Sequence, residues 1–170
     1  MQLRPHQLEA VEALSNNNKG QIIVPTGGGK TMCMITDALN QFEDGNKTLV
    51  VVAPRILLAE QLSTEFMEAI REKYCSVQMM HVHSGKFKNI FSTTSPVKIA
   101  EWCKLFKGNK IIFTTYHSLN RIKESYARVD TIYYDEAHNS VQKNFVEAVD
   151  YFSIYAVSYT HLTLQTILLV

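Results

Sequence analysis

The sequence predicts an α/β protein whose mostly parallel sheet is covered by helices on both faces. Apolar runs of strand length alternate along the chain with segments whose apolar residues recur at helical spacing. The strand candidates are continuously apolar, which is typical of strands buried on both faces of a parallel sheet. With 170 residues, 46% of them hydrophobic and 19% charged, the chain has the size of one ordinary domain or of a fragment of a larger protein.

The first half of the chain predicts a short opening helix and then two units of a strand followed by a helix. Leu8, Val11 and Leu14 have helical spacing behind Pro5, a residue favoured in the first helical turn. The expected elements that follow are a strand at 21–24, a helix through 34–42, a strand at 48–53 and a helix through 59–70. This order is the repeated unit of a parallel sheet.

The second half continues the alternation. We expect strands at 77–82, 111–114 and 131–134, and helices through 99–106 and 141–149. The strand at 77–82 has the weakest pattern of the three. No internal repeat, low-complexity tract or interdomain linker interrupts the sequence, so a single α/β domain is expected.

The composition excludes several classes of protein. A formal net charge of +1 and a pI near 7.7 give no global sign of a nucleic-acid or membrane partner. Cys33, Cys75 and Cys103 lack C-x-x-C spacing, so neither a disulfide framework nor a zinc ribbon is expected. No apolar stretch reaches about 18 residues, and Arg4 and Glu9 lie where a signal peptide is apolar. We therefore expect a cytoplasmic protein, or one of the host cytoplasm if its source is viral, with no membrane partner.

A glycine-rich string lies between the first expected strand and the next helix. In Gly27-Gly28-Gly29-Lys30-Thr31, small residues let backbone N–H groups turn toward a polyphosphate, and the helix adds its positive N-terminal end. Lys30 would reach the β- and γ-phosphates, and the Thr31 hydroxyl would bind Mg²⁺. The strict motif has glycine where this chain has Val24. The alternative is a plain glycine turn before a solvated lysine, but the flanking strand and helix favour a P-loop NTPase.

An acidic pair follows the strand at 131–134. A carboxylate at the carboxyl end of a central strand lies beside the phosphate loop in such sheets. Asp135 would hold Mg²⁺ through its water shell, and Glu136 would take a proton from the water that attacks the γ-phosphorus. The alternative is a helix N-terminus that merely favours acidic residues.

Together these motifs resemble a known family. Pro25-Thr26-Gly27-Gly28-Gly29-Lys30-Thr31 and Asp135-Glu136-Ala137-His138 look like the nucleotide motifs of DEAD/DEAH-box superfamily-two helicases and translocases. Leu3-Arg4-Pro5-His6-Gln7 is similar to the segment ahead of the P-loop in DNA-directed members, such as helicase subunits of restriction systems and viral repair helicases. The resemblance implies a RecA-like domain that uses ATP and Mg²⁺. It also implies that Thr26 belongs to the nucleotide loop, that Gln7 reads adenine and that His138 couples the γ-phosphate to domain movement.

Two further segments resemble nucleic-acid motifs of that family. Ala53-Pro54-Arg55 is similar to motif Ia, and Thr114-Thr115-Tyr116-His117-Ser118 to a later strand-end motif, both of which contact the nucleic-acid backbone. The resemblance thus implies that Pro54, Arg55, Thr115, Tyr116 and His117 bind nucleic acid, DNA rather than RNA.

Two other patterns have competing interpretations. Between Lys86 and Lys110 there are six lysines against one acid, Glu101, which suits phosphate contacts or simply a solvated face. His81 and His83 alternate on a strand, but without further ligands a pair of ordinary histidines is favoured over a metal site.

The end of the sequence departs from the family pattern. The last charged residue is Asp150, and no Ser-Ala-Thr motif follows Ile154. Val157 to Leu164 resembles a translated sequencing-library adapter, so we expect the native domain at 1–156, a non-native tail at 157–170 and no second RecA-like domain in this chain. The alternative is a genuine final strand with a threonine-rich turn.

These patterns indicate the ATP-binding and hydrolysing half of a DNA-directed helicase or translocase, weakly active or inactive alone. The alternative is a module that binds nucleotide and nucleic acid without hydrolysis. A third possibility, a P-loop kinase, needs a lid rich in arginines, and beyond Arg71 the sequence has only Arg121 and Arg128. Nothing in the sequence indicates a homo-oligomer.

Overall fold

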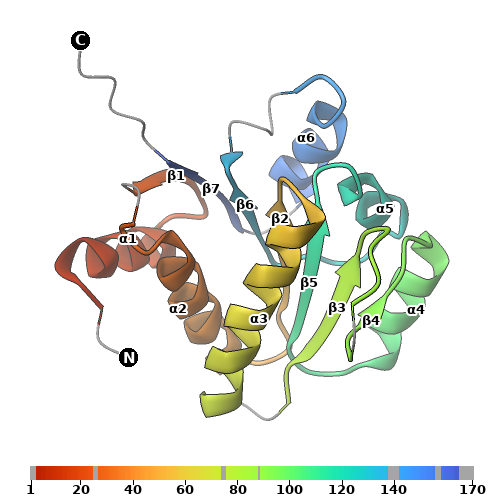
Figure 1. Cartoon of the computed structure of the whole chain (residues 1–170), viewed down its shortest axis with the longest axis horizontal. Coiled ribbons are helices and arrows are strands. Elements are labelled where there is room, and N and C mark those ends of the chain that lie inside the picture. The colour runs from red at the N-terminus through yellow and green to blue at the C-terminus, as the bar shows by residue number, and fades with distance from the viewer. Residues whose placement is uncertain are drawn as a thin grey trace.

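The computed structural model describes residues 3–24, 27–73, 76–87, 89–137, 142–155 and 158–164. Its strands form one seven-stranded sheet in the order β1-β7-β6-β2-β5-β3-β4, and every pairing is parallel (Figure 1). The strands are β1 (Lys19–Val24), β2 (Thr48–Ala53), β3 (Gln78–Val82), β4 (Phe91–Ser92), β5 (Lys110–Thr115), β6 (Thr131–Asp135) and β7 (Ser158–Leu164). The predicted α/β class is confirmed.

Helices cover both faces of this sheet (Figure 1). They are α1 (Pro5–Asn16), α2 (Lys30–Glu43), α3 (Ile56–Lys73), α4 (Pro96–Leu105), α5 (Leu119–Glu124) and α6 (Val146–Tyr155). In the part of the chain that the structure describes, no helix is long and apolar enough to cross a membrane.

Alternate residues of β2 belong to two separate hydrophobic cores. Leu49 and Val51 pack in the core formed with α2 and α3, whereas Val50 and Val52 pack in the core formed with α4, α5 and α6. All four side chains are fully buried. This double burial is the reason that β2 is apolar at every position from Leu49 to Ala53.

The structure adds two short elements that the sequence did not predict. β4 has two residues and α5 has six, so neither is long enough to show a period in its apolar residues. The helix expected through 141–149 begins later, at Val146, and Val141 lies outside the described residues.

Strand β7 lies between β1 and β6, within the expected non-native tail. Gln21 pairs with His161, and Tyr133 pairs with Thr160. The alternative interpretation, a genuine final strand, requires a strand in this position. Without β7, the edges of β1 and β6 that it joins would lack partners for their backbone hydrogen bonds. The boundary at residue 156 stays a prediction.

Candidate nucleotide site

The predicted site residues gather at one edge of the sheet. Because all the strands are parallel, their carboxyl ends share this edge, here called the carboxyl edge. The glycine loop follows β1, the acidic pair ends β6, and the two predicted nucleic-acid segments follow β2 and β5. The fold therefore brings together segments that lie up to about 100 residues apart, as expected for the cleft of a P-loop sheet.

The glycine loop adopts a backbone that favours glycine. Gly27 has φ 73° and Gly29 has φ 79°, both in the left-handed region. α2 begins at Lys30, with Gly29 as its N-cap, and the Cys33 N–H donates to the Gly29 carbonyl at 3.2 Å. A side chain on Gly29 would also meet the Gln7 amide, because an added Cβ would lie 2.2 Å from Gln7 Nε2. The loop is thus shaped by its left-handed glycines and by contact with α1.

Helix α1 holds this loop through two adjacent side chains. Gln7 is buried, and its Nε2 donates to the Gly28 carbonyl at 2.9 Å while its Oε1 accepts from the Arg4 N–H at 2.8 Å. His6 Nε2 donates to the same Gly28 carbonyl at 2.9 Å. Both ends of the Gln7 amide thus bond to backbone here, and its reading of adenine stays a prediction. His6 was missed by the sequence interpretation, although its place beside Gln7 in the family-like segment was a signal.

Lys30 contacts both members of the acidic pair. Its Nζ lies 2.5 Å from Asp135 Oδ1 and 2.8 Å from Glu136 Oε1. Burial of the ammonium disfavours its charge, but the hydrogen bonds to Asp135 and Glu136 outweigh this effect and raise the Lys30 pKa. Lys30 is therefore a fixed cation at the carboxyl edge, held by the two carboxylates predicted to work beside it.

The acidic pair itself is held by backbone contacts and conformation. The buried hydroxyl of Tyr116 donates to the Asp135 carbonyl at 2.8 Å. Glu136 has φ 51°, a left-handed conformation that costs a non-glycine residue free energy and that clusters at functional sites. The chain therefore turns sharply at Glu136, directly after β6 ends at Asp135.

The remaining predicted nucleotide residues divide into two groups. Thr31 lies half-buried in the first turn of α2, beside Lys30. A hydroxyl here and the Asp135 carboxylate are hard oxygen donors, the type that Mg²⁺ prefers, so these residues fit the metal that the resemblance implies. Thr26 and His138 lie outside the described residues.

The predicted nucleic-acid residues are only partly accessible. Arg55 and His117 are exposed at the carboxyl edge and Pro54 is half-buried, but Thr115 and Tyr116 are buried. The ring of Tyr116 packs within the core and its hydroxyl bonds to the Asp135 carbonyl, and the predicted contact of Tyr116 with nucleic acid stays a prediction. Thr115 lies on β5, whose six residues are all buried.

His81 of β3 and His83, which follows directly after this strand, bond to each other inside the protein. His81 Nδ1 lies 2.8 Å from His83 Nε2, and His81 Nε2 lies 3.0 Å from the Ser63 hydroxyl. Burial lowers the His81 pKa to about 4, with a smaller contribution from His83. The pair thus acts as a hydrogen-bonded unit that joins β3 to α3.

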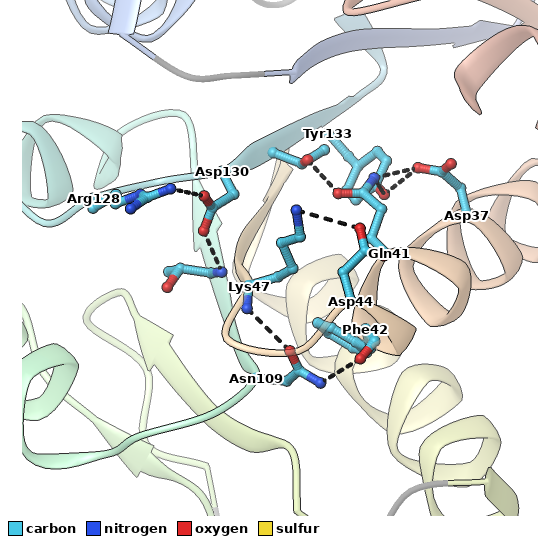
Figure 2. Close-up of polar contacts among 11 residues, drawn as sticks. Asp37, Gln41, Phe42, Asp44, Lys47, Asn109, Arg128, Asp130 and Tyr133 are labelled. Carbon is cyan, nitrogen blue, oxygen red and sulfur yellow. Dashed lines mark hydrogen bonds and ion pairs between the residues drawn. The ribbon is translucent and has the colours of Figure 1, made fainter. Parts of the chain in front are cut away.

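The opposite edge of the sheet, here called the amino edge, carries polar contacts that the sequence did not predict (Figure 2). Asn109 donates to the Phe42 carbonyl at 2.9 Å and accepts from the Lys47 N–H at 3.0 Å. The Tyr133 hydroxyl donates to the Asp37 carboxylate, and Gln41 also bonds to both groups (Figure 2). These residues have no common spacing in the sequence, so no pattern could have indicated them.

Comparisons with known proteins show to which family and fold this chain is similar. A family model described as "Type III restriction enzyme, res subunit" matches residues 1–162. The chain is 37% identical over 57 residues to the ATP-dependent helicase SGS1 of Saccharomyces cerevisiae, a stretch that covers 34% of this chain and 4% of that protein.

Among solved structures, the chain superposes on the type ISP restriction-modification enzyme LlaGI with a TM-score of 0.81 and 25% identity. That structure is a nuclease-deletion mutant in complex with a DNA substrate mimic. That match covers 97% of this chain and 18% of LlaGI. The UvsW helicase of bacteriophage T4 superposes with a TM-score of 0.71 at 14% identity, over 96% of this chain and 52% of UvsW, and shares the fold. The resemblance to superfamily-two helicases and the RecA-like fold are confirmed, and the chain spans a small part of the first relatives that it matches.

Proposed function

This chain belongs to the family of type III restriction enzyme res subunits, and we propose that it is the ATP-binding and hydrolysing half of a DNA-directed helicase or translocase. The observation that carries the proposal is the contact of Lys30 with both Asp135 and Glu136 across the carboxyl edge. A solvated lysine after a plain glycine turn would have no reason to meet a strand-end acidic pair. In the full protein, hydrolysis would drive unwinding or translocation.

Each residue of the site has a proposed role. The N–H groups of the glycine loop and the start of α2 would bind the phosphates, and Lys30 would contact the β- and γ-phosphates. Because Lys30 is already held by two carboxylates, bound phosphate would compete with them for its charge. Glu136, released from Lys30, would accept the proton of the attacking water.

We propose that Thr31 and Asp135 hold Mg²⁺, Asp135 through the metal's water shell. The ion would supply positive charge beside the β- and γ-oxygens. His138 would couple the γ-phosphate to domain movement, and Thr26 would complete the loop.

The nucleic-acid partner is proposed to bind at the exposed residues of the carboxyl edge. Arg55, at the turn from β2 to α3, has the accessible guanidinium that a phosphate contact needs, and His117 lies exposed after β5. DNA is favoured over RNA because LlaGI, the 25% identical structural relative, was solved with a DNA substrate mimic. A second RecA-like domain, expected to complete the ATP cleft, would raise the turnover of the isolated half.

The test is nucleotide binding by the 170-residue chain. Titration of a fluorescent ATP analogue with Mg²⁺ should show saturable binding that the Lys30→Ala variant loses by at least tenfold. Lys73→Ala removes an exposed lysine of α3 and is the matched control, expected to bind like the unchanged chain. Equal affinity of the Lys30→Ala variant and the control would refute the phosphate loop, provided that both remain folded by circular dichroism.

A further inference from the structure

A cationic cavity lies near the amino edge of the sheet, away from the nucleotide site. Its volume is about 540 Å³, within the range of pockets that hold small ligands. The lining residues that matter here are Cys103, Lys104, Lys110, Tyr126, Arg128 and Asp130. They come from α4, the start of β5 and the segment between α5 and β6, so the cavity uses none of the proposed nucleotide residues.

Positive charge dominates the lining of this cavity. Lys110 is 8% exposed, and its Nζ donates to the Phe106 and Gly108 carbonyls at 3.0 and 2.9 Å, both neutral acceptors. No ion pair joins Lys110 to a carboxylate within the described ranges. A buried ammonium held by neutral carbonyls favours an anionic ligand nearby, because its charge is not otherwise offset.

The one acid of the lining has its oxygens engaged. Asp130 Oδ2 accepts from the Thr48 N–H at 2.8 Å, and its Oδ1 lies 3.0 Å from Arg128 Nη2 (Figure 2). The Arg128 side chain is nevertheless 84% exposed, so most of its donors face solvent. With Lys104, Lys110 and Arg128 set against Asp130, the lining has an excess of positive charge that suits phosphate.

An exposed aromatic ring stands at the same cavity. Tyr126 is 84% exposed and has φ 54°, in the left-handed position after α5 where glycine or asparagine is usual. A large aromatic residue is costly there and gains little from burial, so stability does not account for it. An exposed ring beside cations is the combination that binds single-stranded nucleic acid, through base stacking and phosphate contacts.

We propose that this cavity is a second nucleic-acid contact, which takes a single-stranded segment with one base stacked on Tyr126. Its phosphates lie against Lys104, Lys110 and Arg128. A single strand is required, because a paired and stacked base offers no free face to the ring. The contact is independent of the proposed hydrolysis, and it gives a role to two of the lysines between Lys86 and Lys110.

The first test is binding of a fluorescent single-stranded oligonucleotide by the 170-residue chain. Tyr126→Gly removes the ring at a position whose backbone suits glycine, so affinity should fall about tenfold while the thermal unfolding midpoint is maintained or rises. Tyr126→Phe keeps the stacking surface and should bind within about twofold of the unchanged chain. Unchanged affinity of the folded Tyr126→Gly variant would overturn the proposal.

The second test is the salt dependence of the same binding. Lys104→Ala and Arg128→Ala should each reduce the slope of log K against log salt by about 0.7, the value for one phosphate contact with a single strand. Lys73→Ala is the matched control and should leave the slope unchanged. Slopes unaltered in both cavity variants would overturn the phosphate contacts.

Further measurements distinguish binding at this cavity from binding of the oligonucleotide elsewhere on the protein. Duplex of the same sequence should bind the Tyr126→Gly variant and the unchanged chain equally, and pyrophosphate should compete far more weakly than the oligonucleotide. The oligonucleotide should also protect the half-buried Cys103, read by mass spectrometry, from slow alkylation. If binding is lost only with Arg55→Ala and His117→Ala, and Cys103 is not protected, the second contact is wrong while the proposed function stands.

Discussion

The two edges of the sheet use polar side chains in opposite ways. At the carboxyl edge, one ammonium is shared by two carboxylates, and three residues of the site, Gly27, Gly29 and Glu136, have left-handed backbones. At the amino edge, Asp130 and Asn109 are bonded to backbone N–H and carbonyl groups. The first arrangement gathers charged groups around one ammonium, whereas Asp130 and Asn109 satisfy buried backbone groups one by one.

This difference indicates where function and stability reside. Like charges held close together, such as Asp135 and Glu136, cost free energy unless a cation or ligand offsets them, so their presence suits a binding site. Buried backbone groups that form hydrogen bonds with a side chain, as at Asp130 and Asn109, contribute to the stability of the fold. Substitutions of Lys30, Asp135 and Glu136 should therefore alter activity more than stability, and substitutions of Asp130 and Asn109 the reverse.

The largest expected effect is on catalysis at the carboxyl edge. Glu136→Gln keeps the size of the side chain but removes the base, so ATP turnover by this chain should fall by about 10² to 10⁴ while nucleotide still binds. Phosphate release with and without DNA measures this, and Glu124→Gln, which changes an exposed glutamate of α5, is the control. Turnover that survives Glu136→Gln would contradict the role of Glu136 as the base, whereas an unchanged chain that binds nucleotide without any turnover would support the module without hydrolysis.

Next is a loss of stability at the amino edge. Asp130→Ala removes the acceptor of the buried Thr48 N–H, so the free energy of unfolding should fall by about 2–3 kcal/mol in a urea titration. Asp44→Ala, which breaks an exposed pair with Lys47, should cost less than about 0.5 kcal/mol. Nucleotide affinity should stay the same in both variants, and a loss of affinity with Asp130→Ala would contradict the division between the edges.

The third effect is a pH dependence of stability caused by His81, near the carboxyl end of β3. The free energy of unfolding should fall by roughly 2 kcal/mol between pH 7 and 5. Its folded pKa of about 4 lies below the ordinary 6.5, so the unfolded chain binds more protons between these values. The stabilisation is complete above the ordinary pKa and is lost as pH falls toward 4. Urea titrations at several pH values measure it, and His81→Gln should flatten the curve relative to the unchanged chain.

The smallest expected effect is the loss of stability when alanine replaces a glycine with a left-handed backbone conformation, and two such glycines should differ in their effect on nucleotide affinity. Gly108→Ala, at the amino edge with φ 87° and open space for a Cβ, should cost about 1 kcal/mol in stability and nothing in nucleotide affinity. Gly29→Ala carries the same backbone cost, and its Cβ also displaces Gln7 from Gly28, so affinity for the ATP analogue should fall as well. Equal affinities of the two variants would show that Gln7 does not hold the loop.

Much of the fold could be predicted because each central strand contains a continuous apolar run, such as 49–53 in β2 and 111–113 in β5. The runs at 48–53 and 111–114 coincide with β2 and most of β5, and the acidic pair lies at the end of β6 as expected. The inward contact of Tyr116 with β6 was not predicted, because a strand-end motif does not reveal which ring turns toward a neighbouring strand. The hydrogen bonds of Asp130 and Asn109 to backbone groups follow no repeating pattern in the sequence, and they were not predicted.

The segment after residue 156 has two competing interpretations. The sequence there resembles an adapter, whereas the structure pairs Ser158–Leu164 with β1 and β6. Amplifying the source gene past the codon for Ala156 distinguishes them, since independent reads of Val-Ser-Tyr-Thr-His would support the strand. A 1–156 chain that is more soluble than the 170-residue chain would support the adapter, because an uncharged β-prone end favours aggregation.

The sequence by itself determined the α/β class, the glycine loop and the acidic pair, because these depend on local patterns: buried strands are apolar, and phosphate loops need glycine. The tertiary structure alone decided which groups meet. It placed Lys30 between Asp135 and Glu136, joined His6 and Gln7 to Gly28, and set Tyr126 beside Lys104 and Arg128. Such contacts depend on strand order and helix packing, which bring together residues that no spacing along the chain relates.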